Sequence, residues 1–248
     1  MEKESKKWEP EGFKLEAGTV WSFPDRGSWA THDASYRGNW SPYIPRNLIL
    51  RYSKEGELVL DQFVGGGTTL IEAKLLKRNI IGVDVNDKSL KWCKEKTSFF
   101  QSENDGKVYI HKGDARNLDF IPDNSIDFIC THPPYADIIH YSQDIDNDLS
   151  LLGESDFLKA MQEVAGEAYR VLKEGKYCAF LIGDTRIKGK ITPLGFELMK
   201  VFNEQGFKLK EIIIKEQHNC RMTMKWEQIS RERNFMLIAH EYIFVMIK

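Results

Sequence analysis

Two short segments of the chain carry residues that could do chemistry: residues 59–69 (VLDQFVGGGTT) and residues 130–135 (CTHPPY). Each contains or follows an apolar run that predicts a buried strand. Gly65, Gly66 and Gly67 let the backbone pass close to a ligand, and the helix predicted after them presents unpaired N–H groups. His132 could accept a hydrogen bond through an unprotonated ring nitrogen. The two segments therefore predict a ligand-binding turn and a reactive turn at strand ends.

Three acids lie at or just after the ends of successive predicted strands: Asp61, Asp84 and Asp114. Asp61 could pair with an ammonium, Asp84 could accept hydrogen bonds from both hydroxyls of a ribose, and Asp114 is placed to meet an adenine amino group. The glycine turn lacks the lysine of a phosphate loop and the last glycine of the dinucleotide fingerprint. This pattern predicts a ligand with ribose, adenine and a positive charge but no phosphates, which is S-adenosylmethionine.

The reactive turn suits methylation of an exocyclic amino group. The amine of cytosine or adenine is conjugated with its ring, so two acceptors that bind both N–H bonds would free its lone pair. The His132 side chain and the Pro133 carbonyl are the predicted acceptors, and rigid Pro133 and Pro134 hold the backbone open. Tyr135 would stack on a base that has flipped out of its helix.

Residues 61–69 followed by THPPY resemble the amino-methyltransferases that make N4-methylcytosine or N6-methyladenine, known mainly as DNA methylases. Residues 36–49 (YRGNWSPYIPRNLI) are similar to the segment that these enzymes fold over the methionine end of the cofactor. The candidate cofactor-binding residues are Asp61, Phe63, Gly65, Gly67, Thr68, Asp84, Asp114, Ala115 and Thr131. The candidate catalytic residues are His132, Pro133, Pro134 and Tyr135.

Two positions depart from the family pattern. His132 stands where the family usually has Asp, Asn or Ser, and Gln62 stands where it often has Pro. The histidine leaves the choice of base open, and the absence of an acid at this position favours cytosine N4 over adenine N6. Methylation of a cytosine ring carbon needs a Pro-Cys nucleophile, and the sequence contains no such dipeptide.

The resemblance implies DNA as the substrate, but the chain has no room for a large recognition region. Structured RNA, such as ribosomal RNA, is therefore the alternative. A non-catalytic binding protein and a small-molecule methyltransferase fit less well, because the Pro-Pro-Tyr turn would have no purpose there. With a net charge of −2, a nucleic-acid surface must concentrate its basic residues. The candidates are Arg186 and Lys188, and, in a predicted hairpin over residues 215–234, Arg221, Lys225, Trp226, Arg231 and Arg233.

The segment directly after the reactive turn is acidic. Residues 136–150 (ADIIHYSQDIDNDLS) carry four aspartates. Two explanations stay open: the segment orders over the flipped base, or it contacts a partner subunit in a homodimer.

The elements that must position these residues alternate between strand and helix. We expect a charged leader over residues 1–18 and a single methyltransferase domain over residues 19–248. Apolar patterning predicts seven strands, at 57–64, 79–86, 107–115, 125–131, 176–184, 207–216 and 235–248. It predicts helices at 45–52, 68–78, 88–100, 155–175 and 193–206, the fourth capped by Ser155 and ended by Gly175. The fold class is therefore α/β: a doubly wound, mostly parallel, Rossmann-like methyltransferase sheet with an antiparallel edge strand.

Composition is that of an ordinary globular protein, with 42% hydrophobic and 29% charged residues. No apolar run approaches the roughly 18 residues of a membrane helix, and the first residues lack the apolar core of a signal peptide. We expect a cytoplasmic protein without membrane contact. The four cysteines are far apart, so neither disulfides nor a metal site are expected.

Overall fold

The computed structural model describes residues 7–36, 38–135, 145, 147–187, 189–219 and 223–248. The helices are α1 (Tyr43–Tyr52), α2 (Thr68–Leu75), α3 (Asp87–Lys96), the short 3₁₀ helix η1 (Leu149–Leu151), α4 (Glu154–Val171), α5 (Leu194–Glu204) and α6 (Thr223–Glu232). The strands are β1 (Val20–Trp21), β2 (Leu58–Asp61), β3 (Asn79–Asp84), β4 (Val108–Lys112), β5 (Ile126–Thr131), β6 (Leu172–Ile182), β7 (Thr185–Ile187), β8 (Lys190–Thr192), β9 (Lys208–Glu216) and β10 (His240–Ile247).

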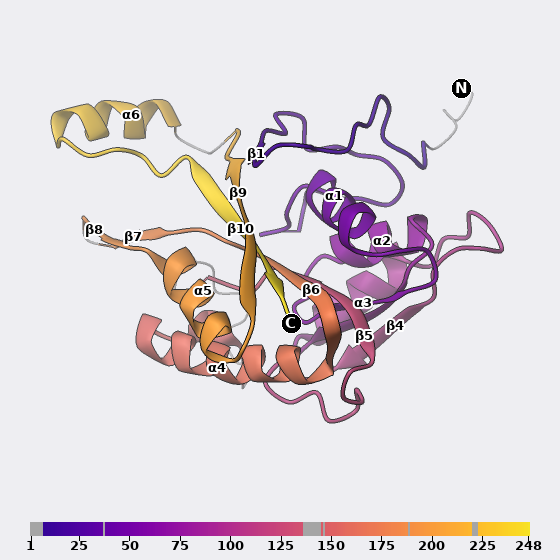
Figure 1. The fold of residues 1–248 in the computed structure, drawn as a ribbon. Helices are drawn as coiled ribbons and strands as arrows, with labels where there is room; N and C mark the ends of the chain where they lie inside the picture. The colour runs from indigo at the N-terminus through magenta and orange to yellow at the C-terminus, as the bar shows by residue number, and fades with distance from the viewer. Residues whose placement is uncertain (1–6, 37, 136–144, 146, 188, 220–222) are drawn as a thin grey trace, which may run out of the picture.

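The main sheet has eight strands in the order β1-β9-β10-β6-β5-β2-β3-β4. The run from β6 to β4 is parallel, whereas β10 is antiparallel to both of its neighbours. Helices α4 and α5 cover one face, and α1, α2 and α3 cover the other (Figure 1). The prediction of a doubly wound, mostly parallel sheet is confirmed.

Two details of the sheet differ from the prediction. It has eight strands rather than seven, because Val20 and Trp21 pair with the end of β9. The last two strands are antiparallel to each other, as expected, but β10 lies between β6 and β9 rather than at the edge. Composition explains this order: five consecutive residues of β10 are buried, whereas β9 is mostly polar and partly exposed. An apolar strand gains more from a position inside the sheet.

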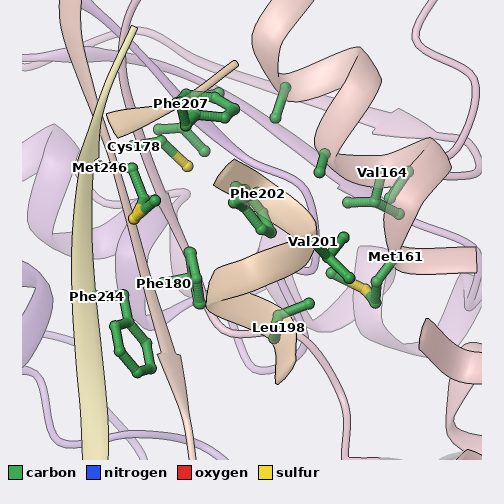
Figure 2. Packing of buried hydrophobic residues seen from close by; sticks show 14 of the residues in the cluster. Met161, Val164, Cys178, Phe180, Leu198, Val201, Phe202, Phe207, Phe244 and Met246 are labelled. Atoms are coloured by element: carbon green, nitrogen blue, oxygen red, sulfur yellow. The ribbon is translucent and has the colours of Figure 1, made fainter. Parts of the chain in front are cut away.

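A close-packed core fills the space between the sheet and helices α4 and α5. Phe180 of β6 stacks on Phe202 of α5 with ring centroids 4.4 Å apart, and Phe244 of β10 lies 5.5 Å from Phe180 (Figure 2). Cys178 belongs to the same core, and its thiol is buried and free. All six residues of β5 are buried, so the strand that leads to the reactive turn is fixed on both faces.

Two helical boundaries were predicted wrongly. Helix α4 begins at Glu154 after Gly153, without a side-chain cap from Ser155, and it ends at Val171 rather than near Gly175. The reason is tertiary: Leu172 already pairs with Ile126 in the sheet, which takes these residues out of the helix. The segment predicted as a plain hairpin between the last strands contains helix α6.

In the part of the chain that the structure describes, no helix is long and apolar enough to span a bilayer.

A buried carboxylate fixes the N-terminal segment to the sheet's helical cover. Glu72 of α2 accepts hydrogen bonds from Trp29 Nε1 at 2.7 Å and from Arg46 Nη1 at 2.9 Å, and its Oε1 lies 2.7 Å from His32 Nε2. Arg46 also pairs with Glu9 of the predicted leader. These contacts hold Trp29, His32 and Arg46 against α2, and they thereby fix both ends of the loop between Trp29 and α1.

Replacing Glu72 by alanine should lower the free energy of unfolding by about 3–5 kcal/mol, because the change leaves the buried Arg46 guanidinium without its buried partner. Urea unfolding followed by circular dichroism measures this. Glu55→Ala is the matched control: its side chain is 65% exposed and pairs with Lys77, so we expect a change below about 1 kcal/mol. Equally small losses in both variants would contradict the anchoring role.

Candidate active site

The carboxyl ends of β2, β3 and β5 open onto one cavity. We call it the strand-end cavity and define it by Asp61, Phe63, Gly65, Asp84, Ala115 and His132. It encloses about 780 Å³, including the space at its mouth. A parallel sheet brings the ends of neighbouring strands to the same edge, so the two motifs meet there as predicted.

The glycine turn is closely covered by the side chains of Tyr36 and Asn39. Gly67 adopts a left-handed conformation (φ 79°) and forms the N-cap of α2. A Cβ at Gly66 would lie 2.7 Å from the Asn39 side chain, so this close approach requires glycine. Thr68 Oγ1 donates to Asn39 Oδ1 at 2.7 Å, which ties the covering segment to the turn. The sequence segment that resembles a cofactor cover therefore does form a wall of the cavity.

Two acids face the cavity: Asp61, which is buried, and Asp84, which is half-buried. Asp61 Oδ1 accepts hydrogen bonds from Thr131 Oγ1 at 2.9 Å and from the Phe63 N–H at 3.1 Å. Asp84 accepts from the Gly65 N–H at 3.0 Å through one oxygen and from the Asn86 N–H at 2.8 Å through the other. Burial raises the pKa of Asp61 to about 6, and it also raises the pKa of Asp84 above its ordinary value. A cation in the cavity would restore the charge of both carboxylates.

Asp114 lies at the cavity wall but is already paired. Arg116 donates to both of its carboxylate oxygens, with Nη2 2.6 Å from Oδ2, and also reaches Asn147 Oδ1 at 2.8 Å. Each carboxylate oxygen accepts more than one hydrogen bond, so capacity for an amino group remains. The position of Asp114 fits the predicted adenine contact, and the contact itself stays a prediction.

His132 also lines the strand-end cavity. Its ring stacks on Trp40 with centroids 5.4 Å apart and an interplanar angle of 23°. Burial lowers the pKa of His132 to about 4; the charge of Glu241 acts in the opposite direction, and those of Lys215 and Arg26 act in the same direction as burial. The imidazole is therefore neutral near pH 7 and keeps one nitrogen as an acceptor.

The Tyr135 side chain is held by a charged pair from strands β9 and β10. Its hydroxyl donates to Glu241 Oε1 at 2.7 Å and lies 3.3 Å from His132 Nε2. Lys215 Nζ lies 2.8 Å from the second carboxylate oxygen of Glu241. Lys215 and Glu241 face each other across the antiparallel β9–β10 pair, so the sheet register brings them to the reactive turn.

A second cavity adjoins the first. We call it the outer cavity and define it by Trp40, His132, Tyr135, Asp184, Lys215 and Glu241. Gly38, Asn39, Trp40 and His132 line both cavities and form the wall between them. Ligands in the two cavities would therefore lie on either side of these residues, and both would be next to the His132 side chain.

The structure sorts the predicted site residues into three groups. Those that line the strand-end cavity are Asp61, Phe63, Gly65, Asp84, Asp114, Ala115, His132 and Pro134. The second group lines neither cavity and consists of Gly67, Thr68, Thr131 and Pro133; within it, Thr68 and Thr131 donate hydrogen bonds to the lining residues Asn39 and Asp61. Tyr135 faces the outer cavity, together with His132.

The predicted nucleic-acid contacts form a separate group. Lys225, Arg231 and Arg233 are exposed, and Trp226 is 48% exposed on α6. Arg186 of β7 lies over the Phe235 ring and donates a hydrogen bond to the Met236 carbonyl. The β7–β8 hairpin is therefore in contact with the chain after α6. Figure 1 shows both at the end of the molecule farthest from α3. Lys188 and Arg221 lie outside the described residues. The positive charge is not uniform, because α6 also carries two glutamates, Glu227 and Glu232.

Sequence reasoning missed Trp40, Lys215 and Glu241 as individual site residues. One signal could have found Glu241: it is an acid at the start of the strand HEYIFVMI, which is otherwise almost entirely apolar. A charge in such a strand needs a partner, and Lys215 occupies the paired position.

Comparison with known proteins agrees with this geometry. The family model described as DNA methylase matches residues 1–95 and 126–248. The chain belongs to the DNA methylase family. A second model, described as a methyltransferase domain, matches residues 61–147, which include both motifs.

Relatives match in part of their length. The orphan methyltransferase M.BamHII of Bacillus amyloliquefaciens is 30% identical over 128 residues, which cover 52% of this chain and 40% of that protein. The tRNA (guanine(10)-N2)-dimethyltransferase of Methanothermobacter thermautotrophicus is 34% identical over 102 residues, 41% of this chain and 29% of that protein. The chain thus spans less than half the length of these curated relatives.

Solved structures confirm the fold. TrmN from Thermus thermophilus superposes with a TM-score of 0.60 at 20% identity, covering 87% of this chain and 51% of that one. A SAM-dependent methyltransferase from Methanosarcina mazei superposes with a TM-score of 0.57 at 15% identity, covering 81% and 96%. The cofactor of this methyltransferase fold is S-adenosylmethionine.

The strand-end cavity fits S-adenosylmethionine in its charge. Asp61 and Asp84 face it, and among the described residues that line it there is neither Lys nor Arg. A phosphate-bearing nucleotide would need positive charge or free N–H groups, and the Gly65 N–H is already occupied by Asp84. The site therefore suits a cationic, phosphate-free ligand, in which Asp84 would hold the ribose and Asp61 the ammonium.

Affinity for S-adenosylmethionine should rise from about pH 5 to about pH 7, because Asp61 has a pKa of about 6 and must ionise to stabilise a cation. Asp61→Asn should be weaker at neutral pH and show a flatter profile. Titration calorimetry measures both. The raised pKa of Asp84 contributes in the same direction, so the difference between the two proteins isolates Asp61. The same pH profile in both proteins would contradict this role.

Proposed function

We propose that the protein transfers a methyl group from S-adenosylmethionine to the exocyclic amino group of a nucleobase in nucleic acid. The observation that carries the proposal is the position of His132, whose ring lies in the wall between the strand-end cavity and the outer cavity. A cofactor in the first cavity and a base in the second would meet at this ring.

The residues of the turn supply what the reaction needs from the protein. When bound, S-adenosylmethionine supplies an electrophilic methyl group on a sulfonium, whose C–S electron pair stays with sulfur as the new N–C bond forms. Neutral His132 accepts one amino N–H, which localises the nitrogen lone pair, and it can take the proton that the methylated nitrogen loses. The carbonyl of Pro133, the other predicted acceptor, belongs to a buried residue that lines neither cavity, so its contact with the amine stays a prediction.

The outer cavity has the surface that a flipped base requires. Phe23, Trp40 and Tyr135 contribute aromatic rings, and Asp184 and Glu241 contribute carboxylates. Aromatic faces stack on any base, whereas polar groups read its edge. The hydrogen bond from Tyr135 to Glu241 holds the tyrosine ring in a fixed position, so this ring is the proposed stacking platform.

Cytosine N4 is the favoured target over adenine N6, because His132 replaces the acid typical of adenine enzymes. DNA is the proposed nucleic acid on the strength of the family. Structured RNA is the second candidate, which is supported by the similarity to a relative described as a tRNA (guanine(10)-N2)-dimethyltransferase. Cytidine N4 methylation in RNA would use the same residues.

The outer cavity lies at the base of the proposed nucleic-acid surface. Asp184 directly precedes β7, and His218 and Asn219 precede α6; all three line the cavity. A nucleic acid bound along α6 and the β7–β8 hairpin would therefore pass the mouth of the cavity that receives its base.

The direct test is incubation with S-adenosylmethionine carrying a labelled methyl group and, in separate reactions, DNA, total RNA and ribosomal particles. Digestion to nucleosides should then place the label in N4-methylcytosine or its ribonucleoside. His132→Ala should lower turnover at least about 100-fold, because it removes an acceptor and proton carrier, while cofactor affinity stays near normal.

His111→Ala is the matched control. His111 is exposed near the end of β4, where its ring stacks on Phe120. Label in no nucleoside would overturn the proposed function. Unchanged turnover in His132→Ala would overturn the role of the imidazole.

Reversing the charges of Lys225, Arg231 and Arg233 together should weaken nucleic-acid binding and flatten its dependence on salt. On a duplex, the log–log slope should fall by up to about 0.9 for each phosphate that the variant no longer neutralises. Fluorescence anisotropy over a series of salt concentrations measures both effects. The change should act on binding, with little effect on cofactor affinity.

A matched triple reversal at Lys54, Lys91 and Lys107, all exposed on other parts of the surface, controls for the change in net charge. If binding weakens equally in the two triple variants, α6 does not contact the nucleic acid.

A further inference from the structure

We infer that Glu241, oriented by Lys215, is a positioning residue that sets the proton on the His132 ring through Tyr135. The inference rests on the proposed function in one respect: the position of the proton matters for catalysis because His132 accepts a hydrogen bond from the substrate amine. The contacts that carry it lie within the chain and need no substrate.

The first step concerns the charge of Glu241. Its side chain is 13% exposed, and Lys215 Nζ lies 2.8 Å from its Oε2. Burial raises the pKa of this carboxyl, whereas the charge of Lys215 and the hydrogen bonds from Lys215 and Tyr135 lower it, and the resulting pKa lies below its ordinary value. Glu241 is therefore ionised at neutral pH, and an ionised carboxylate only accepts hydrogen bonds.

The second step follows the hydroxyl proton of Tyr135. A tyrosine hydroxyl has one proton, and the O···O distance of 2.7 Å to Glu241 Oε1 shows where it goes. Towards His132 the tyrosine oxygen can then only accept. Since His132 Nε2 lies 3.3 Å from that oxygen, Nε2 must carry the imidazole proton.

The third step gives the consequence for catalysis. A neutral imidazole with its proton on Nε2 has its lone pair on Nδ1, so Nδ1 is the acceptor for the substrate amine. When Nδ1 takes the amine proton, the ring becomes an imidazolium, and the charge of Glu241 stabilises it through Tyr135. The positive charges of Lys215 and Arg26 disfavour the imidazolium, so the Glu241 carboxylate is needed to offset them.

The arrangement differs from a structural ion pair in what it predicts for the ring. A cross-strand Lys–Glu pair that only stabilised the sheet would have no effect on the His132 tautomer. Here the connection runs through two hydrogen bonds from β10 to the reactive turn, over 106 positions in sequence. The tautomer of His132 is therefore the decisive observable.

Long-range ¹H–¹⁵N correlation spectra of the full chain, without nucleic acid, measure the tautomer. His132→Asn serves to assign the signal. We expect Nε2 protonated and Nδ1 unprotonated in the native protein. In Glu241→Gln the tyrosine hydroxyl loses its charged acceptor and can donate to Nε2, so the Nδ1–H tautomer should become populated.

In the labelled-methyl assay, Glu241→Gln should lower kcat about 10- to 100-fold, the size typical of a residue that orients a reactive group, with little change in KM. Glu211→Gln is the matched control, because Glu211 lies on β9 and its paired residue, Val245, is apolar. It should leave both the tautomer and kcat unchanged. Circular dichroism and cofactor affinity establish that each variant is folded.

The two proposals fail in different ways. A native His132 that carries its proton on Nδ1, or a tautomer that Glu241→Gln does not change, overturns the positioning role while methyl transfer stands. Absence of methylated nucleosides overturns the proposed function, and the spectra still decide whether Glu241 sets the ring.

Discussion

The hydrogen bond from Thr131 to Asp61 joins the two halves of the site. It can form because β2 and β5 are parallel neighbours, with Leu60 opposite Ile129, so both strands end at the same edge of the sheet. A shift of one residue would turn each side chain to the other face of its strand. The glycine turn, Asp61 and the Pro-Pro turn thus depend on one strand pairing, and the neighbouring β2–β3 pair brings Asp84 to the same edge.

Burial then determines the charges at this edge. The low dielectric around the strand ends disfavours ionised forms, which raises the pKa of Asp61 to about 6 and lowers the pKa of His132 to about 4. One effect produces two properties that methyl transfer needs. A cationic donor is favoured beside the acids, and the imidazole stays neutral and able to accept a hydrogen bond. The same burial makes Glu72 a strong anchor for the segment that covers the glycine turn.

The sequence predicted the parts of the molecule whose causes are local. Apolar strands alternating with helices defined the sheet, and the two motifs located the cavity. What it missed depends on distant contacts: the two-residue strand Val20–Trp21 has no pattern of its own and exists because β9 offers an edge. Likewise, Glu241 reaches Tyr135 from 106 positions away. Asp114 shows a third limit, since its pairing with Arg116 depends on a side-chain conformation that sequence does not specify.

A crystal structure with S-adenosylmethionine bound most directly tests the claim that the cofactor and the base bind on the two sides of the wall at His132. The wall formed by Trp40 and His132 predicts that the ribose lies at Asp84, the ammonium near Asp61, and the methyl group beside the His132 ring, facing the outer cavity. A cofactor whose methyl group faces away from His132, or that binds outside the strand-end cavity, would contradict it.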